Sequence, residues 1–142
     1  MRLVLKPLFN AELPHGFEEI VLSKLTGREV KTGDTVEIDL LGKTLRFKVV
    51  QADPSPMRVE RKTRIELTTS EIDEITLEFD DEVEEVMPFA RGIAVVLGNR
   101  VELYDWKGQK VYSRKFDKLK EIRVTEERVV IVHGKNITIL EP

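Results

Sequence analysis

Cysteine is missing from this chain of 142 residues, and histidine occurs only as His15 and His133. Without cysteine, the chain has no disulfides, thiolate metal sites or cysteine nucleophiles. The two histidines lie in different halves of the sequence, so we expect neither a metal site nor a cofactor. No apolar run approaches the roughly 18 residues of a membrane span, and the N-terminus lacks the apolar region of a signal peptide. We therefore expect a cytoplasmic protein.

The chain also has no excess of positive charge, and it has few side-chain amides. The formal net charge is −3 and the pI is about 5.6, which argues against a nucleic-acid partner bound through its phosphates. Apolar residues make up 41% of the chain and charged residues 35%, enough for a core and a soluble surface. Two glutamines and three asparagines accompany 49 charged residues (23 + 26), a composition that favours a hyperthermophilic source.

Motifs for catalysis are missing as well. Gly42-Lys43-Thr44 is similar to the end of a phosphate-binding loop, but that loop needs a glycine at position 37, where Glu37 stands. It also needs a following helix, and the residues after Thr44 alternate as a strand. No serine lies near a histidine or in a Gly-x-Ser-x-Gly setting. We expect no catalytic residues, no ATP binding and no enzymatic activity.

Alternating apolar residues predict strands through most of the first half. TVEIDL (35–40) and TLRFKVV (44–50) form one hairpin, with Gly42 in the turn at positive φ. FKVVQADPSPMRVERKTRIEL (47–67) predicts two alternating strands around a rigid corner, because Pro54 and Pro56 fix φ and withhold two N–H donors. Only residues 14–34 have some helical character. Seven short strand-like runs by residue 70 predict a closed or clam-shaped β-barrel.

The second half follows a run of nine acidic residues between positions 71 and 85, which marks a domain boundary near 70–72. Residues 84–105 align with residues 120–141 at a constant offset of 36. A period near 40 with three or four strands per unit is the signature of β-propeller blades. The first repeat has strands a, b, c and d, whereas the second has only a, b and c. A compact eight-stranded sandwich is the alternative for this half.

The fourth strand missing from the second repeat has a counterpart before the first. EITLEF (74–79) aligns with VYSRKF (111–116), so residues 72–142 have the strand order d-abcd-abc. Two blades are wedges that cannot close on themselves. We expect residues 74–79 to complete the last blade of a neighbouring chain, a strand exchange that closes a homo-oligomeric ring.

The first half also resembles a known family. LKPLF (5–9), KTGDTVEIDL (31–40) and FKVVQADPSPMRVERKTRIEL resemble the second subdomain of the N-terminal region of valosin-containing AAA ATPases, including their archaeal VAT relatives. The resemblance covers residues 2–68 and implies a small β-clam that takes part in recognising substrates and adaptors. The repeats beyond it look like propeller blades of an archaeal protein of this two-part build.

These expectations combine into an all-β protein with a β-clam domain (1–71) and a two-blade propeller segment (72–142). The hexameric ATPases of the resembled family favour a hexameric ring, with a trimer as the next possibility. We expect a non-enzymatic module that presents several clams to unfolded or extended polypeptides or to partner proteins, so that avidity strengthens binding. The alternatives are an adaptor for a separate ATPase or protease ring, and a ligand-binding or catalytic propeller channel.

Basic side chains around the two-proline corner form the candidate polypeptide-binding face. They occupy polar positions of the predicted strands and turn, where they would favour acidic or mixed-charge segments and bind less well at high salt. A plain solvated barrel face is the alternative. The six residues are Arg46, Lys48, Arg58, Arg61, Lys62 and Arg64.

Overall fold

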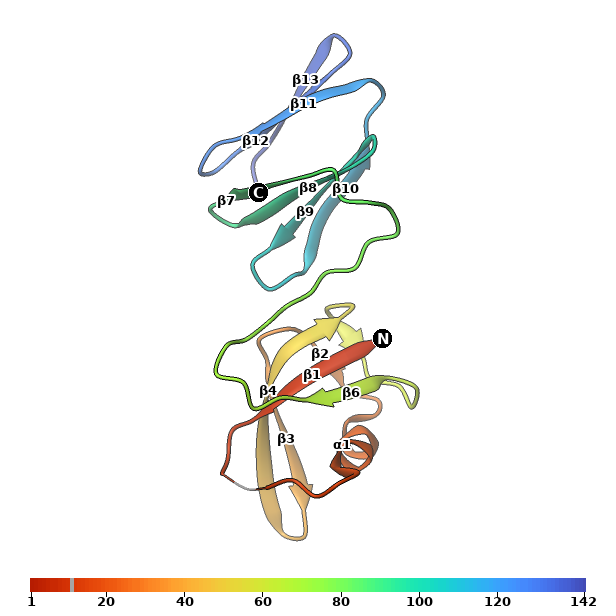
Figure 1. Ribbon diagram of the computed structural model, residues 1–142, viewed down its shortest axis with the longest axis vertical. Helices are drawn as coiled ribbons and strands as arrows, with labels where there is room; N and C mark the ends of the chain where they lie inside the picture. The colour runs from red at the N-terminus through yellow and green to blue at the C-terminus, as the bar shows by residue number, and fades with distance from the viewer. Residues whose placement is uncertain (11) are drawn as a thin grey trace. The chain divides into compact units, whose positions relative to one another are not determined.

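Strands dominate both halves of the chain, as the alternating pattern predicts. The computed structural model describes residues 1–10 and 12–142, and the chain divides into two units, Met1–Thr76 and Leu77–Pro142. We call the first the clam unit and the second the blade unit. Figure 1 shows the separate sheets of the two units. The all-β fold class is confirmed.

The clam unit contains a four-stranded sheet, a two-stranded sheet and one helix. The sheet order is β3-β4-β1-β6, in which β1 runs antiparallel to β4 and parallel to β6, while β2 pairs with β5. The described residues of this unit form six strands, one fewer than the seven predicted runs, and the helix lies within residues 14–34, where the sequence has helical character. The elements are β1 (Arg2–Pro7), α1 (Phe17–Leu25), β2 (Glu29–Val30), β3 (Thr35–Leu40), β4 (Lys43–Asp53), β5 (Met57–Arg58) and β6 (Arg64–Leu67).

Phe47 of β4 lies at the centre of the clam core. Its side chain is fully buried, and the ring of Phe9 meets it edge-on with centroids 5.4 Å apart. The helix covers this core with Phe17, Val21 and Leu25, which are spaced four residues apart and therefore share one face. Burial of this apolar face stabilises a helix of only nine residues, which would be marginal alone.

The hairpin between β3 and β4 agrees with the sequence prediction. Leu41 and Gly42 both have positive φ, 52° and 79°, as a two-residue turn matched to the strand twist requires. The alternation on β3 is also confirmed, since Val36 and Ile38 are buried between exposed neighbours.

The predicted second strand within residues 57–67 is wrong in one respect, because a turn divides it. β5 ends at Arg58, and Thr63 closes the turn by donating its N–H to Glu60 O (3.0 Å) and accepting from Glu60 N–H (2.9 Å). The main chain of Val59 bonds instead to residues 27 and 28, beside β2. Alternation survives the break because Val59 and Ile65 still point to apolar surroundings.

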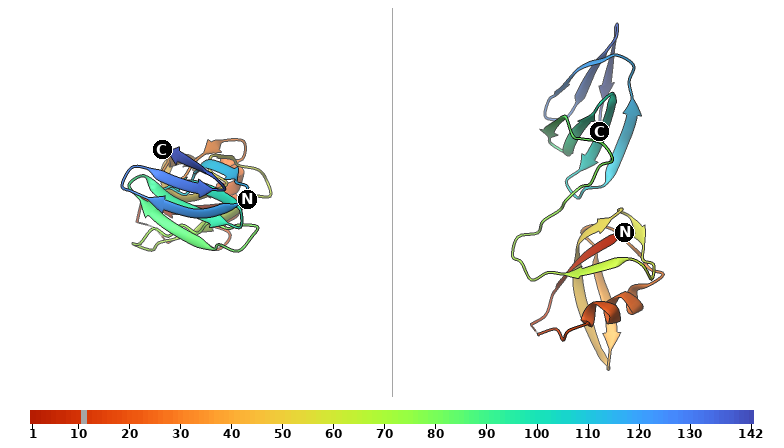
Figure 2. Two further views of the ribbon diagram at one scale, coloured as in Figure 1. Left: turned by 90° about the horizontal axis from the view of Figure 1, so that it is seen from above. Right: turned by 45° about the vertical axis from the view of Figure 1, so that its right-hand side comes forward.

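The blade unit contains two antiparallel sheets, which Figure 2 shows as stacked layers. The first blade has the order β10-β9-β8-β7, and the second has β11-β12-β13. Shifting β8 and β9 by 36 residues places them on β12 and β13 within one residue at each end, so the repeat is confirmed. The elements are β7 (Glu85–Phe89), β8 (Gly92–Leu97), β9 (Arg100–Asp105), β10 (Lys110–Lys115), β11 (Leu119–Val124), β12 (Val129–His133) and β13 (Asn136–Leu140).

Residues 74–79, the expected exchanged strand, form no strand within the single chain. Their burial nevertheless alternates, with Ile75, Leu77 and Phe79 half-buried between exposed neighbours. The unit boundary falls after Thr76, so residues 72–76, which the acidic run assigned to the blades, belong with the clam unit. Contacts of Asp73 and Thr76, described below, hold them there.

Within the described residues, no helix is long and apolar enough to cross a membrane.

Candidate functional site

The six basic residues of the candidate polypeptide-binding face lie on several elements of the clam unit. Arg46 and Lys48 are on β4, and Arg64 is on β6 at the opposite end of the sheet, because Lys48 pairs with Lys6 whereas Arg64 pairs with Arg2. Arg58 is on the separate β2–β5 sheet. The structure therefore does not bring all six together on one sheet.

Contacts within the clam unit occupy four of these six side chains. Arg46 pairs with Glu37 (2.9 Å) and Arg64 with Glu66 (3.4 Å). Arg58 Nη1 donates to the carbonyl oxygen of Gly27 (3.0 Å), and Lys48 pairs with Asp73. Arg61 and Lys62 are exposed in the 60–63 turn and have no hydrogen bond or ion pair among the described residues.

The described residues contain no group of three or more acidic, histidine or cysteine side chains placed to hold a metal ion. His133 instead sits at the end of β12, as the sequence suggested, where its Nε2 lies 2.7 Å from Thr138 Oγ1. Its ring packs against Phe116 with centroids 4.7 Å apart. His133 thus belongs to the packing between the blades.

The central strands of the first blade, β8 and β9, are buried on both faces of the sheet. On one face, Val101 and Leu103 are 0% and 2% exposed and pack with Ile122 and Ile131 of the second blade. On the other face, Val95, Leu97 and Tyr104 form a second cluster, against which Leu77 and Phe79 pack. Phe79 meets Tyr104 edge-on at 5.5 Å between centroids.

The second blade leaves one of its faces open. The residues that correspond to Val101 and Leu103 are Ile137 and Ile139 of β13, and their side chains are 64% and 60% exposed. Two neighbouring branched apolar side chains at this exposure are a sign of an interface in a soluble protein. The same repeat unit thus presents the same face, covered in one blade and uncovered in the other.

The edge of β13 is open as well. In an antiparallel ladder, alternate residues direct both main-chain groups toward the same partner strand. Phe116 N–H donates to Asn99 O (2.7 Å), so every second residue after Asn99 faces β10. By the 36-residue offset, Ile137 and Ile139 direct their N–H and C=O groups away from β12. We call this the acceptor edge.

We call residues 74–79 the donor segment. Its residues Leu77 and Phe79 lie against the first blade in the way that Phe116, after β10, lies against the second. Phe116, the last residue of the VYSRKF repeat, packs into the cluster between the blades. Its counterpart Phe79 packs in the same way on the first blade, beside Leu97 and Tyr104. The residues 36 positions after Leu97 and Tyr104 are His133 and Leu140, and both lie in the cluster around Phe116. Phe79 therefore has the same neighbours in the repeat as Phe116.

A buried carboxylate lies on the face of the first blade against which Leu77 and Phe79 pack. Glu102 is 3% exposed and accepts hydrogen bonds from Tyr104 Oη (2.7 Å) and Ser113 Oγ (2.9 Å). Lys110 Nζ and Arg100 Nε lie 3.3 and 3.4 Å from Glu102 Oε2. Burial alone raises the pKa of Glu102, but the bonds from Tyr104, Ser113 and Lys110 outweigh it and lower the pKa.

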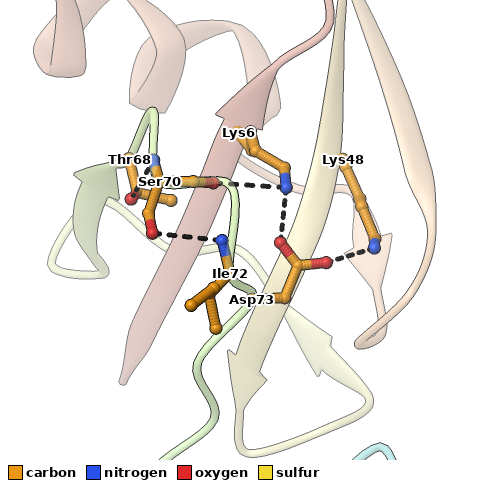
Figure 3. A network of polar contacts seen from close by, with 6 residues as sticks. All are labelled: Lys6, Lys48, Thr68, Ser70, Ile72 and Asp73. Carbon is orange, nitrogen blue, oxygen red and sulfur yellow. Dashed lines mark hydrogen bonds and ion pairs between the residues drawn. The ribbon is translucent and has the colours of Figure 1, made fainter.

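Two contacts within the clam unit hold Asp73, just before the donor segment, and Thr76, within it. Figure 3 shows Asp73 between Lys6 (2.5 Å) and Lys48, while Lys6 Nζ also donates to Ser70 O (3.4 Å). The hydrogen bonds from Lys48 and Lys6 lower the pKa of Asp73. At the second contact, Gln51 binds both main-chain groups of Thr76.

Sequence reasoning missed Glu102, Asp73 and Gln51. Glu102 does carry a signal, because it interrupts the apolar run of residues 101–104 and is therefore a charged side chain in a buried strand. Asp73 carries none, as one acid among nine. Gln51 follows Phe47 and Val49 at strand spacing, so a polar residue at an apolar position could have drawn attention to it.

Comparison with known proteins confirms both resemblances. Residues 12–74 match the family model for Cell division protein 48 (CDC48), domain 2, and residues 76–141 match a domain of unknown function (DUF6849). No curated protein matches the chain.

Three solved structures of one archaeal protein are similar to this chain. The crystal structure of Pyrococcus horikoshii Ph1500 is 35% identical, with 100% of each chain covered and a TM-score of 0.58. A solution structure describes Ph1500 as "a homohexameric protein centered on a 12-bladed beta-propeller"; it is 36% identical over 99% of this chain and 96% of that one, with a TM-score of 0.49. The solution structure of the N-terminal domain of PH1500 is 52% identical, covers 49% of this chain and 91% of that one, and has a TM-score of 0.44. The chain belongs to the same family as Ph1500.

Proposed function

We propose that this member of the Ph1500 family forms a homohexameric ring that presents six clam units to unfolded or extended polypeptides, without catalytic activity of its own. Ph1500 is described as a homohexamer around 12 blades. The present chain contributes two blades, so six copies would supply the same number. Full-length identity of 35% to Ph1500 supports the same assembly here.

The observation that carries the ring is the open second blade. No strand among the described residues pairs with its acceptor edge, and Ile137 and Ile139 beside that edge are more than half exposed. The donor segment has the matching pattern and no pairing of its own. Joining the donor segment of one chain to the acceptor edge of the next completes a four-stranded blade and removes an aggregation-prone edge.

Native mass measured by light scattering tests the ring. We expect the wild-type chain to have six times its 16.4 kDa monomer mass. Ile139→Pro should reduce the mass to that of monomers or small oligomers, because it removes an N–H that faces the donor strand but none that faces β12. Ile139→Val is the matched control and should keep the hexamer. A wild-type monomer, or an Ile139→Pro hexamer, would contradict the proposed assembly.

Polypeptide recognition is the second part of the proposal. It is supported by the match of residues 12–74 to domain 2 of CDC48 and by the exposed basic turn that contains Arg61 and Lys62. The edge strands β3 and β6 could accept an added strand through main-chain hydrogen bonds. Several weak sites on one ring would then bind an extended chain by avidity.

Suppression of a model protein's aggregation tests recognition. We expect wild-type rings to suppress aggregation, and we expect both the ring-breaking Ile139→Pro variant and the double variant Arg61→Glu/Lys62→Glu to lose most of this effect. Lys118→Glu/Lys120→Glu makes the same charge change in the blade unit and is the matched control. Equal activity of the basic-turn variant and the wild type would exclude Arg61 and Lys62 from recognition. Inactive wild-type rings would contradict the proposed binding of unfolded chains.

A further inference from the structure

Gln51 is a buried polar side chain on the outer face of the clam sheet. It is 2% exposed and pairs across strands with Val4, whose neighbours Leu3 and Leu5 belong to the core. Cross-strand partners share a face, so Gln51 lies on the side opposite the core. A register shift between Val4 and Leu5 puts it there, although it follows the core residue Val49 by two positions.

The carboxamide of Gln51 binds the main chain of Thr76 and is oriented for this by Arg2. Gln51 Nε2 donates to Thr76 O (2.6 Å), and Gln51 Oε1 accepts from Thr76 N–H (3.0 Å). Arg2 Nη2 also donates to Gln51 Oε1 (2.7 Å), which orients the amide with its oxygen toward Thr76 N–H. The side chain thus binds one residue of the donor segment as a neighbouring strand would.

The first blade indicates which edge of the donor segment Gln51 occupies. Phe116 directs its main chain toward β9, so Ser113, three residues earlier, directs its own away from it. Thr76 is the counterpart of Ser113, just as Phe79 is the counterpart of Phe116. The edge bound by Gln51 is therefore the one that faces away from an acceptor strand. Within the described residues, the main chains of Ile75, Leu77 and Phe79 make no hydrogen bond.

We propose that Gln51 caps the outer edge of the donor segment at Thr76 and holds it ready for the acceptor edge of the neighbouring chain. The cap exists before exchange and survives it, because it uses the edge that the neighbour does not need. It also blocks that outer edge against pairing with a further strand, which is the hazard of any exposed edge. The Asp73 contact with Lys6 and Lys48 fixes the segment three residues earlier.

This inference rests on the strand exchange proposed above, and hydrogen exchange at single-residue resolution on the full-length ring separates the two. In the wild type we expect protected amides at Leu77 and Phe79, through the acceptor edge, and also at Thr76, through Gln51. Gln51→Leu should reduce protection of the Thr76 amide about tenfold, as expected for loss of one hydrogen bond, while Leu77 stays protected. Dissociation by Ile139→Pro should instead reduce protection of the Leu77 amide while the Thr76 amide stays protected.

Proline substitutions give a second measurement that does not depend on the folding of a Gln51 variant. Thr76→Pro removes only the N–H that Gln51 binds, so the hexamer should persist. Leu77→Pro removes an N–H that the acceptor edge needs, so the hexamer should dissociate. A Thr76 amide that exchanges freely in wild-type rings, or dissociation by Thr76→Pro, would overturn the cap and leave the exchange intact. An intact Leu77→Pro hexamer would overturn the exchange itself.

Discussion

The two blades of this chain share a repeat but differ in what covers them. Val101 and Leu103 in the first blade are buried, whereas Ile137 and Ile139 at the same positions of the second are 64% and 60% exposed. All four side chains are apolar, so composition does not explain the difference. What differs is the neighbour: the first blade packs against the second, whereas the part of the chain that the structure describes places no further sheet on this face of the second. An incomplete blade can thus be identified where equivalent apolar residues are buried in one repeat and exposed in the next.

Deletion of the donor segment should have the largest effect on this comparison. Without residues 72–80, the second blade cannot receive a fourth strand from a neighbouring chain, so its open state becomes permanent. We expect monomers or aggregates, because the bare edge and the exposed isoleucines remain. Size-exclusion chromatography with light scattering measures this directly. Wild-type mass after the deletion would mean that strand exchange does not hold the ring together.

Equivalent substitutions in the two blades should affect different properties: the stability of the chain in the first blade and the assembly of the ring in the second. Leu103→Ala leaves a cavity in a packed core and should cost about 2–5 kcal/mol of unfolding free energy. Ile139→Ala should instead weaken assembly, so that its effect grows on dilution and is small in the separated chain. Denaturant unfolding at two protein concentrations distinguishes these outcomes. A cost at Ile139 that does not change with concentration would mean that this face is not an interface.

Glu102 places an ionisable group at a position of the first blade where the second blade has Thr138. The pKa of Glu102 is lower in the folded chain than its ordinary value of 4.5, so its bonds stabilise the folded state fully above that pH. This stability is lost as the pH falls through the lower, folded-state pKa. Glu102→Gln should cost about 1–3 kcal/mol at pH 7.

Unfolding free energies of wild type and Glu102→Gln, measured from pH 7 down to pH 3, test this. The difference between them should be constant above the ordinary pKa and should shrink in acid. Thr125→Val, which removes the hydroxyl that accepts from Arg128 N–H in the second blade, is the control, and its cost should not change over this range. A constant difference between wild type and Glu102→Gln down to pH 3 would contradict a lowered pKa.

Asp73 should give the smallest effect, because its contacts with Lys6 and Lys48 are at the surface. Asp73→Asn should lower the unfolding free energy of the clam unit by less than about 1 kcal/mol, and salt should remove most of the difference. Bonds from both lysines lower the pKa of Asp73, so this stabilisation too is lost on acidification. Titration of the Asp73 carboxyl by NMR, with and without Lys48→Met, measures it; an unchanged pKa in the variant would contradict the stated cause.

Local pattern was enough to predict much of the fold. The 36-residue offset located β7–β9 and β11–β13, and alternation located the β3–β4 hairpin with Gly42 at positive φ. The resemblance over residues 2–68 agrees with the CDC48 domain 2 match. Whether the six basic side chains recognise polypeptides is still a prediction. The pattern failed at residues 60–63, because a turn closed by Thr63 conserves the alternation on both sides and leaves no trace in it.

Periodicity along the chain is a local property, so the sequence alone could establish the strands and the repeats. It could also show that the second repeat has three strands where the first has four. Which groups meet depends on contacts between residues far apart in sequence. A single register shift at Val4 moves Gln51 out of the core, where Arg2 and Thr76 bind it across 49 and 25 residues. Period-two alternation cannot reveal such a shift, because one extra residue reverses every face beyond it. Glu102 and Asp73 likewise acquire their partners, and their lowered pKa values, only when distant strands pack together.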